Sequence, residues 1–137
     1  MAKVSGLGGA LNIADASGTV QTLTDDCTNW QLSTPRAVQD VTGLGKSANA
    51  RILLLADISV TFNGVVNPGT NTSHEVFNSI PSTSVARSTG IIPTSGTTPA
   101  LYANLLLTDY QITRANTGEL TWQVPGSLAD GTVPVWT

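Results

Sequence analysis

Two segments in the middle and near the end of the chain alternate regularly between apolar and polar residues. They cover residues 58–66 and 120–124, and every second residue in each is apolar. A period of two is typical of a β-strand with one face toward a core and the other toward solvent. The side chains expected in the core, including one from a predicted helix, are Ile58, Val60, Phe62, Phe77, Leu120 and Trp122.

Further segments favour extended structure without so clear an alternation. They cover residues 11–14, 19–24, 30–41, 85–92, 100–114 and 132–136. Pro35 interrupts the third of them, which indicates an edge, a bulge or a bend. The long segment 100–114 carries apolar residues on both faces near 105–107, so we expect it to be covered on both sides. The last segment is expected to form a final strand or an extended arm.

One short helix is predicted in the middle of the chain. Thr72 and Glu75 have the spacing of a capping box, an apolar stripe follows at 76–80, and Pro81 ends the helix after about two turns. The expected fold class is therefore mainly β, a β-sandwich or open barrel with one short α-helix. We expect a single domain over residues 1–137, with an N-terminal arm at about residues 1–9.

Residues 42–50 form a polar, glycine-punctuated segment (TGLGKSANA) that fits no regular element. Loops of this length in compact domains are usually functional. The apolar run Ile52-Leu53-Leu54-Leu55 follows directly and shows no alternation that would place it in a core. An exposed apolar run of this kind favours aggregation unless a partner covers it.

Charge is scarce in this chain. Charged residues make up 11% of its 137 residues, and the net charge is −3, whereas about 25% is typical of soluble domains. A weakly charged surface loses little hydration when it is covered, which suits interfaces between proteins. Six lysines and arginines are too few for a strong phosphate-binding face, so tight nucleic-acid binding is not expected.

The residues that could carry catalysis form no recognisable constellation. Lys46 lies in a Gly-Lys-Ser triplet, but the upstream glycine of a phosphate-binding loop is replaced by Asp40. Cys27 and His74 are the only residues of their types and lie far apart in the sequence. We therefore expect no catalytic residues, no metal site and no cofactor, and we predict that the chain is not an enzyme. His74 is expected to be exposed in the first turn of the helix.

Several short segments resemble one known family when they are taken in order. Residues 40–47 read DVTGLGKS, 58–64 read ISVTFNG, 107–110 read LTDY and 128–136 read LADGTVPVW. With the helix between them, they are similar to the tail tube (major tail) proteins of long-tailed bacteriophages. The resemblance extends from about Ile13 to the end of the chain.

The resemblance implies a structural role in the tail of a virion of the siphovirus type. Subunits of this family form hexameric rings that stack into a hollow tube, and double-stranded DNA passes through the lumen during ejection without specific binding. The implied partners are further copies of the chain and other tail proteins (tail tip, tape measure and terminator), with no membrane. Assembly is expected in the host cytoplasm.

The resemblance also assigns surfaces to residues. The segment 40–57 is expected to project and to contact the adjacent ring. Its expected contact residues are Asp40, Thr42, Lys46, Arg51, Ile52, Leu53, Leu54 and Leu55. Because this segment carries few charges, apolar contact and backbone pairing are expected to dominate over salt bridges. Candidate lumen-facing residues on the polar faces of the two alternating strands are Ser59, Thr61, Asn63, Thr121 and Gln123.

Two other classes of protein fit parts of the pattern. A carbohydrate-binding or adhesin β-sandwich would use aromatic residues as a stacking platform, although Tyr110 and Trp122 lie on predicted strands and are expected in the core. Another virion component, such as a tail terminator or a capsid decoration protein, would share the fold class. A terminator would form single rings that do not stack.

Overall fold

The computed structural model describes residues 3–96 and 98–137, and strands dominate it. The expected fold class, mainly β with one short helix, is confirmed. In chain order the elements are β1 (Ala10–Ala14), β2 (Val20–Thr22), β3 (Cys27–Ser33), β4 (Arg36–Asp40), β5 (Arg51–Ala56), β6 (Ser59–Val65), α1 (Ser73–Phe77), β7 (Arg87–Ile92), β8 (Leu101–Leu107), β9 (Gln111–Arg114) and β10 (Leu120–Leu128).

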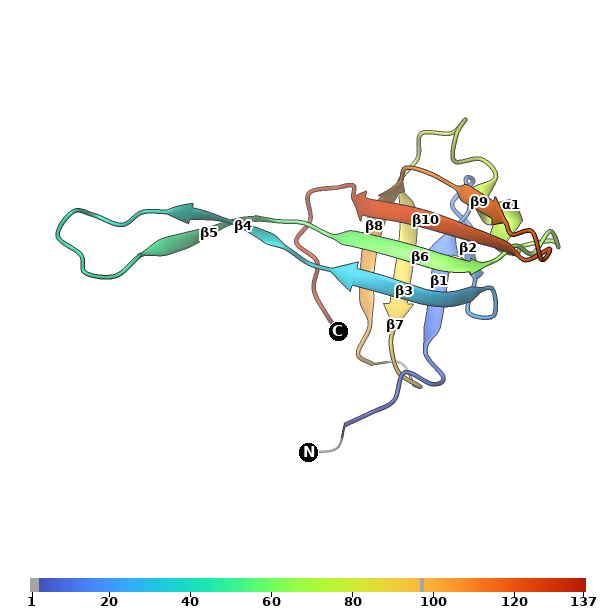
Figure 1. Ribbon diagram of the computed structural model, residues 1–137, viewed down its shortest axis with the longest axis horizontal. Helices are drawn as coiled ribbons and strands as arrows, with labels where there is room; N and C mark the ends of the chain where they lie inside the picture. The colour runs from blue at the N-terminus through green and yellow to red at the C-terminus, as the bar shows by residue number, and fades with distance from the viewer. Residues whose placement is uncertain (1–2, 97) are drawn as a thin grey trace.

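All strand pairs are antiparallel, and they form one large sheet and one hairpin. The large sheet has the order β2-β1-β7-β8-β10-β6-β3, and β9 also pairs with β10. In Figure 1, β3, β6 and β10 run across the strands β1, β7 and β8 behind them, so the sheet folds over on itself into two crossed layers. The hairpin of β4 and β5 is a separate two-stranded sheet.

The core fills the space between the two layers and beneath α1. Ile58, Val60, Phe62, Phe77 and Trp122 are all buried within it. The prediction for Leu120 is wrong, because its side chain is 41% exposed. Leu120 begins β10 opposite the exposed Arg114, outside the buried cluster, so its strand faces the core only from Trp122 onward.

Residues 100–114 form two strands and not the single strand expected. β8 pairs with β7 and meets β10 only at its end, through Leu105, Leu106 and Leu107. β9 pairs with the beginning of β10. The chain crosses from one layer to the other between the two strands. Leu105 is buried but Leu106 is exposed, so the expectation that both faces are covered is wrong within one chain.

The helix α1 is a single turn, shorter than predicted, and the Thr72 side chain does not cap it. The Thr72 hydroxyl donates toward the carbonyl oxygens of Gly69 and Asn67, at 2.6 and 2.8 Å. The helix is instead capped by Asp26, from the segment between β2 and β3. The Ser73 N–H donates to Asp26 Oδ2 at 3.0 Å. A tertiary contact thus replaces the local one that the sequence pattern predicts.

His74 is half-buried and not exposed as expected. Its Nδ1 lies 3.1 Å from the Tyr110 hydroxyl, and the Tyr110 ring packs on Phe77 with centroids 5.6 Å apart. The contact helps to fix α1 against the segment between β8 and β9.

Both ends of the chain run along the surface. Residues 3–8 are exposed, and the first two residues of the expected arm lie outside the described residues. At the other end, Trp136 forms an isolated bridge with Leu101, while Val133 and Val135 remain exposed. The C-terminal segment is therefore an extended arm held at one point and not a full strand.

Arg87 is a buried cation that ties β7 to β1 and α1. Its Nη1 donates to the carbonyl oxygens of Val76 (2.7 Å) and Ala14 (3.2 Å), and its Nη2 donates to Ser79 Oγ (3.1 Å). Burial lowers the pKa of the guanidinium, and the charge of Asp15 acts in the opposite direction. The arginine satisfies the Val76 carbonyl near the end of α1 and the Ala14 carbonyl at the end of β1, which would otherwise be buried without this donor.

Replacing Arg87 by Met should therefore reduce the free energy of unfolding by about 1–3 kcal/mol, the cost of leaving buried acceptors without donors. Urea denaturation monitored by circular dichroism measures the change. Arg87→Lys is the matched control, since it keeps the charge but offers fewer donors. We expect its free energy of unfolding to lie between those of the wild type and of Arg87→Met. An unchanged denaturation midpoint for Arg87→Met would show that the three contacts contribute no net stability.

Candidate assembly surfaces

The β4–β5 hairpin extends far from the body of the molecule (Figure 1). It begins at Arg36 and ends at Ala56. The expected segment 40–57 therefore covers its tip and its second strand, but includes only the last residue, Asp40, of its first strand. All of the predicted contact residues lie on this hairpin, from Asp40 to Leu55.

A local network closes the tip of the hairpin. The Thr42 hydroxyl donates to Asp40 Oδ1 at 2.6 Å and accepts from the Ala50 N–H at 2.7 Å. The hydrogen bonds from the Thr42 side chain and backbone hold the pKa of Asp40 below its usual value. Asp40 is also directly opposite Arg51 across the strands. Residues 43–49, which include Lys46, form the exposed tip beyond this network.

Both faces of the hairpin are apolar. Val38 is opposite Leu53 on one face, and Gln39 is opposite Ile52 on the other. Since successive residues of a strand point to opposite faces, Leu54 and Leu55 extend the apolar character on both. The exposed apolar side chains of the hairpin are Val38, Val41, Leu44, Ile52, Leu53, Leu54 and Leu55. A surface this apolar is typical of an interaction site.

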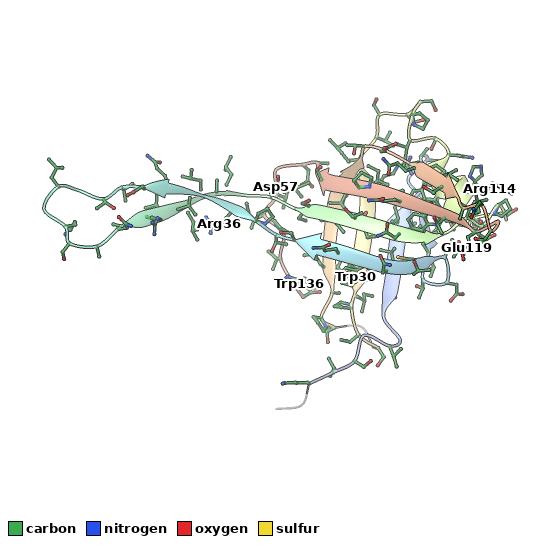
Figure 2. All side chains as sticks on the ribbon, viewed as in Figure 1. Trp30, Arg36, Asp57, Arg114, Glu119 and Trp136 are labelled. Carbon is green, nitrogen blue, oxygen red and sulfur yellow. The ribbon has the colours of Figure 1, made fainter. Side chains whose placement is uncertain are left out.

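Several hydrogen bonds join the two strands at the base of the hairpin. The pairing shifts register between Arg36 and Val38, and the Arg36 side chain donates from Nε and Nη2 to the Leu54 carbonyl oxygen, at 3.0 and 2.9 Å. The Asp57 N–H donates to the Pro35 carbonyl oxygen at 2.9 Å. Figure 2 shows Arg36 and Asp57 where the hairpin leaves the body.

The second surface is the outer face of β3, β6, β10 and β9, which we call the polar face. Its hydroxyl and amide side chains are Asn29, Gln31, Ser33, Ser59, Thr61, Asn63, Gln111, Thr113, Thr121, Gln123 and Ser127. Val65 and Pro125 complete it. Among the described residues of β3, β6, β10 and β9, no charged side chain lies on the polar face. All five predicted lumen candidates lie on it, and each is exposed or half-buried.

The polar face is ordered into rows by the strand register. Asn29, Asn63, Gln123 and Gln111 are consecutive cross-strand neighbours, and the Asn63 side-chain amide donates to Asn29 Oδ1 at 2.7 Å. Ser33, Ser59 and Ser127 form a second row. The sequence prediction missed the members on β3 and β9, because which strands lie beside β6 and β10 is a matter of tertiary pairing.

The polar face ends in two strand edges. Within the described chain β3 pairs only with β6, and β9 pairs only with β10. At the β3 edge Trp30 and Leu32 are half-buried, and at the β9 edge Ile112 is 47% exposed. Edges with free backbone groups and partly uncovered apolar side chains are templates for pairing with another chain.

A shallow depression in the polar face bears on the carbohydrate-binding alternative. It has a volume of about 410 Å³ and is lined by Thr28, Asn29, Asn63, Gly64, Thr113, Thr121, Trp122 and Gln123. Its only aromatic residue, Trp122, is 2% exposed and donates its Nε1–H to the Val65 carbonyl oxygen at 2.9 Å. The ring therefore offers no face on which a sugar stacks.

Among residues 3–96 and 98–137, no group of three or more His, Cys, Asp and Glu side chains is placed to hold a metal ion. In the same part of the chain, no helix has the length and apolar character needed to span a bilayer.

Comparison with solved structures finds this fold in phage-like tails. One match is to the tail of an empty gene transfer agent particle, solved with C6 symmetry, and another is to the virion of a native gene transfer agent particle. Each has a TM-score of 0.71 at 17% sequence identity, over 98% of this chain and 99% of the other chain. Protein-family models and curated proteins, when searched with the sequence, gave no match.

Proposed function

We propose that this chain is the structural subunit of a phage-type tail tube, in which six copies form a ring and rings stack into a hollow conduit. The observation that carries the proposal is the hairpin with two uncovered apolar faces, on a fold that matches tail subunits over nearly its whole length. The C6 symmetry of the matched tail supports rings of six.

The ring follows from the two open edges. Strand directions alternate across β3, β6, β10 and β9, so β9 of one copy and β3 of the next run antiparallel when placed side by side. Joining them in this way removes both edges and gives a closed barrel. The polar face then lines the bore. Its neutral side chains form no ion pairs with phosphates, so DNA passes without being held.

The stack follows from the hairpin, which reaches beyond its own ring to the adjacent one. Burial of its apolar side chains against neighbouring subunits stabilises the stack, with Asp40, Lys46 and Arg51 contributing at the tip. The role is structural and needs no cofactor or catalytic residue. The partners are other copies of the chain and the tail tip, tape measure and terminator proteins, in the tail of a virion assembled in the host cytoplasm.

Negative-stain electron microscopy of the purified protein tests the proposal. We expect rings of uniform diameter at low concentration and stacked tubes with a central channel at high concentration. Single rings that never stack would instead indicate a terminator. A protein that stays monomeric at high concentration and binds glycans on an array would contradict the proposal and favour the carbohydrate-binding class.

A further inference from the structure

We infer the register in which neighbouring copies pair around the ring. The inference rests on the proposed function: β9 of one copy lies antiparallel to β3 of the next, with Gln111 opposite Ser33 and Thr113 opposite Gln31. These residues belong to the polar face of each copy, so the junction continues that face without a break.

The two faces of the sheet restrict the choice of register. Asn29, Gln31 and Ser33 point to the polar face from β3, and Gln111 and Thr113 do so from β9. A shift by a single residue would turn every side chain of one strand to the wrong side. Gln111 must therefore lie opposite Asn29, Gln31 or Ser33, or further along by steps of two.

The closure of a tilted barrel excludes the simplest of these registers. Within one copy Gln111 lies in the same row as Asn29, so pairing Gln111 with the neighbour's Asn29 would need strands parallel to the tube axis. Barrel strands tilt by roughly 35–45°. Across four strands at about 4.8 Å spacing, such a tilt displaces the next copy by about 13–19 Å, or about four to six residues.

The lengths of the two strands select the displacement. A displacement of about four residues places Gln111 opposite Ser33 and lays all of β9 against the second half of β3. A displacement of about six residues places Gln111 opposite Pro35, beyond the end of β3, where proline lacks the N–H that pairing requires. A displacement of about four residues in the opposite direction places it opposite Asp25, before β3 begins.

The side chains on the other face support the same register. It brings Ile112 opposite the neighbour's Leu32 and Arg114 opposite the neighbour's Trp30. Ile112 is exposed in the single chain and Leu32 is half-buried, so the first pair covers apolar surface at both edges. The second pair places a guanidinium beside an indole, a favourable cation–π arrangement. Figure 2 shows Trp30 on β3 and Arg114 on β9, at opposite margins of the sheet.

Paired cysteines test the register directly. Directly opposite residues of antiparallel strands have Cα atoms about 4.5–5.5 Å apart, within the range of a disulfide. Three variants are compared on a Cys27→Ser background, which removes the one native thiol. They are Ser33→Cys with Gln111→Cys, Gln31→Cys with Gln111→Cys, and Asn29→Cys with Gln111→Cys.

After mild oxidation of assembled protein, the first variant should give a ladder of covalent multimers on non-reducing gels, most of the protein shifting upward and returning to monomer with reductant. The other two should remain largely monomeric. A ladder from either of them would overturn the inferred register. Rings or tubes that cross-link in none of the three would overturn the β3–β9 junction but leave the proposed function standing, whereas unmodified protein that forms no rings overturns both.

Discussion

Replacing Leu53 and Leu54 together by Asp should give a folded subunit that forms no tubes. The two side chains point to opposite faces of β5, and they are 57% and 39% exposed in the single chain. Neither contributes to the core, so the subunit keeps its fold. In a stack, each carboxylate would be buried without a partner. Each such buried charge would cost about 3–5 kcal/mol of stacking free energy.

Electron microscopy measures tube formation in this variant, and far-UV circular dichroism measures its fold. The matched control replaces both leucines by Met, which keeps an apolar hairpin of similar volume and should form tubes. The single variants Leu53→Asp and Leu54→Asp then report which face of the hairpin contributes more. Tubes of normal length from the double Asp variant would exclude the hairpin as the stacking contact.

Replacing Trp122 by Ala should reduce the free energy of unfolding by about 3–5 kcal/mol, as for other large core aromatics. The Trp122 ring packs on Phe77 with centroids 4.9 Å apart. Its truncation also leaves the Val65 carbonyl oxygen without the donor that it has at 2.9 Å. Chemical denaturation in the Leu53→Asp, Leu54→Asp background measures the change without interference from the stacking of rings into tubes.

Leu120→Ala is the matched control for this change. Leu120 lies on the same strand and the same side as Trp122 but is exposed and outside the buried cluster, so we expect a loss below about 1 kcal/mol. Equal losses for the two variants would mean that Trp122 does not belong to the core. A loss larger than expected for Leu120 would mean that a part of the chain covers it in solution.

The alternation of β6 and β10 was sufficient to predict these two strands and the core side chains Ile58, Val60, Phe62 and Trp122, since a period of two reports local geometry. It did not reveal the part of the core that β1, β7 and β8 supply. It was not sufficient for Leu120, because burial also depends on which element lies opposite. The break between β8 and β9 was missed for the same reason: the transfer of a chain from one layer to another leaves no mark on hydrophobic periodicity. The cap of α1 by Asp26 is a long-range contact that local motifs do not contain.

The sequence predicted only some of the residues of each candidate surface. The apolar run Ile52 to Leu55 indicated a contact site, but the absence of alternation obscured its strand, because both faces of the hairpin are apolar. Val38 was not among the predicted contact residues, although it lies on β4 directly opposite Leu53. On the polar face, Ser59 and Gln123 were predicted from strand alternation, whereas Asn29 and Gln111 join them only through the register of neighbouring strands.

The hairpin leaves the body on one side only (Figure 1). A filament joined through it is consequently directional: one terminus displays unengaged hairpins, and the other displays vacant sites that receive them. Elongation and termination then involve chemically different ends. A capping factor that recognises one of these ends would fix the length of the filament without acting on the other.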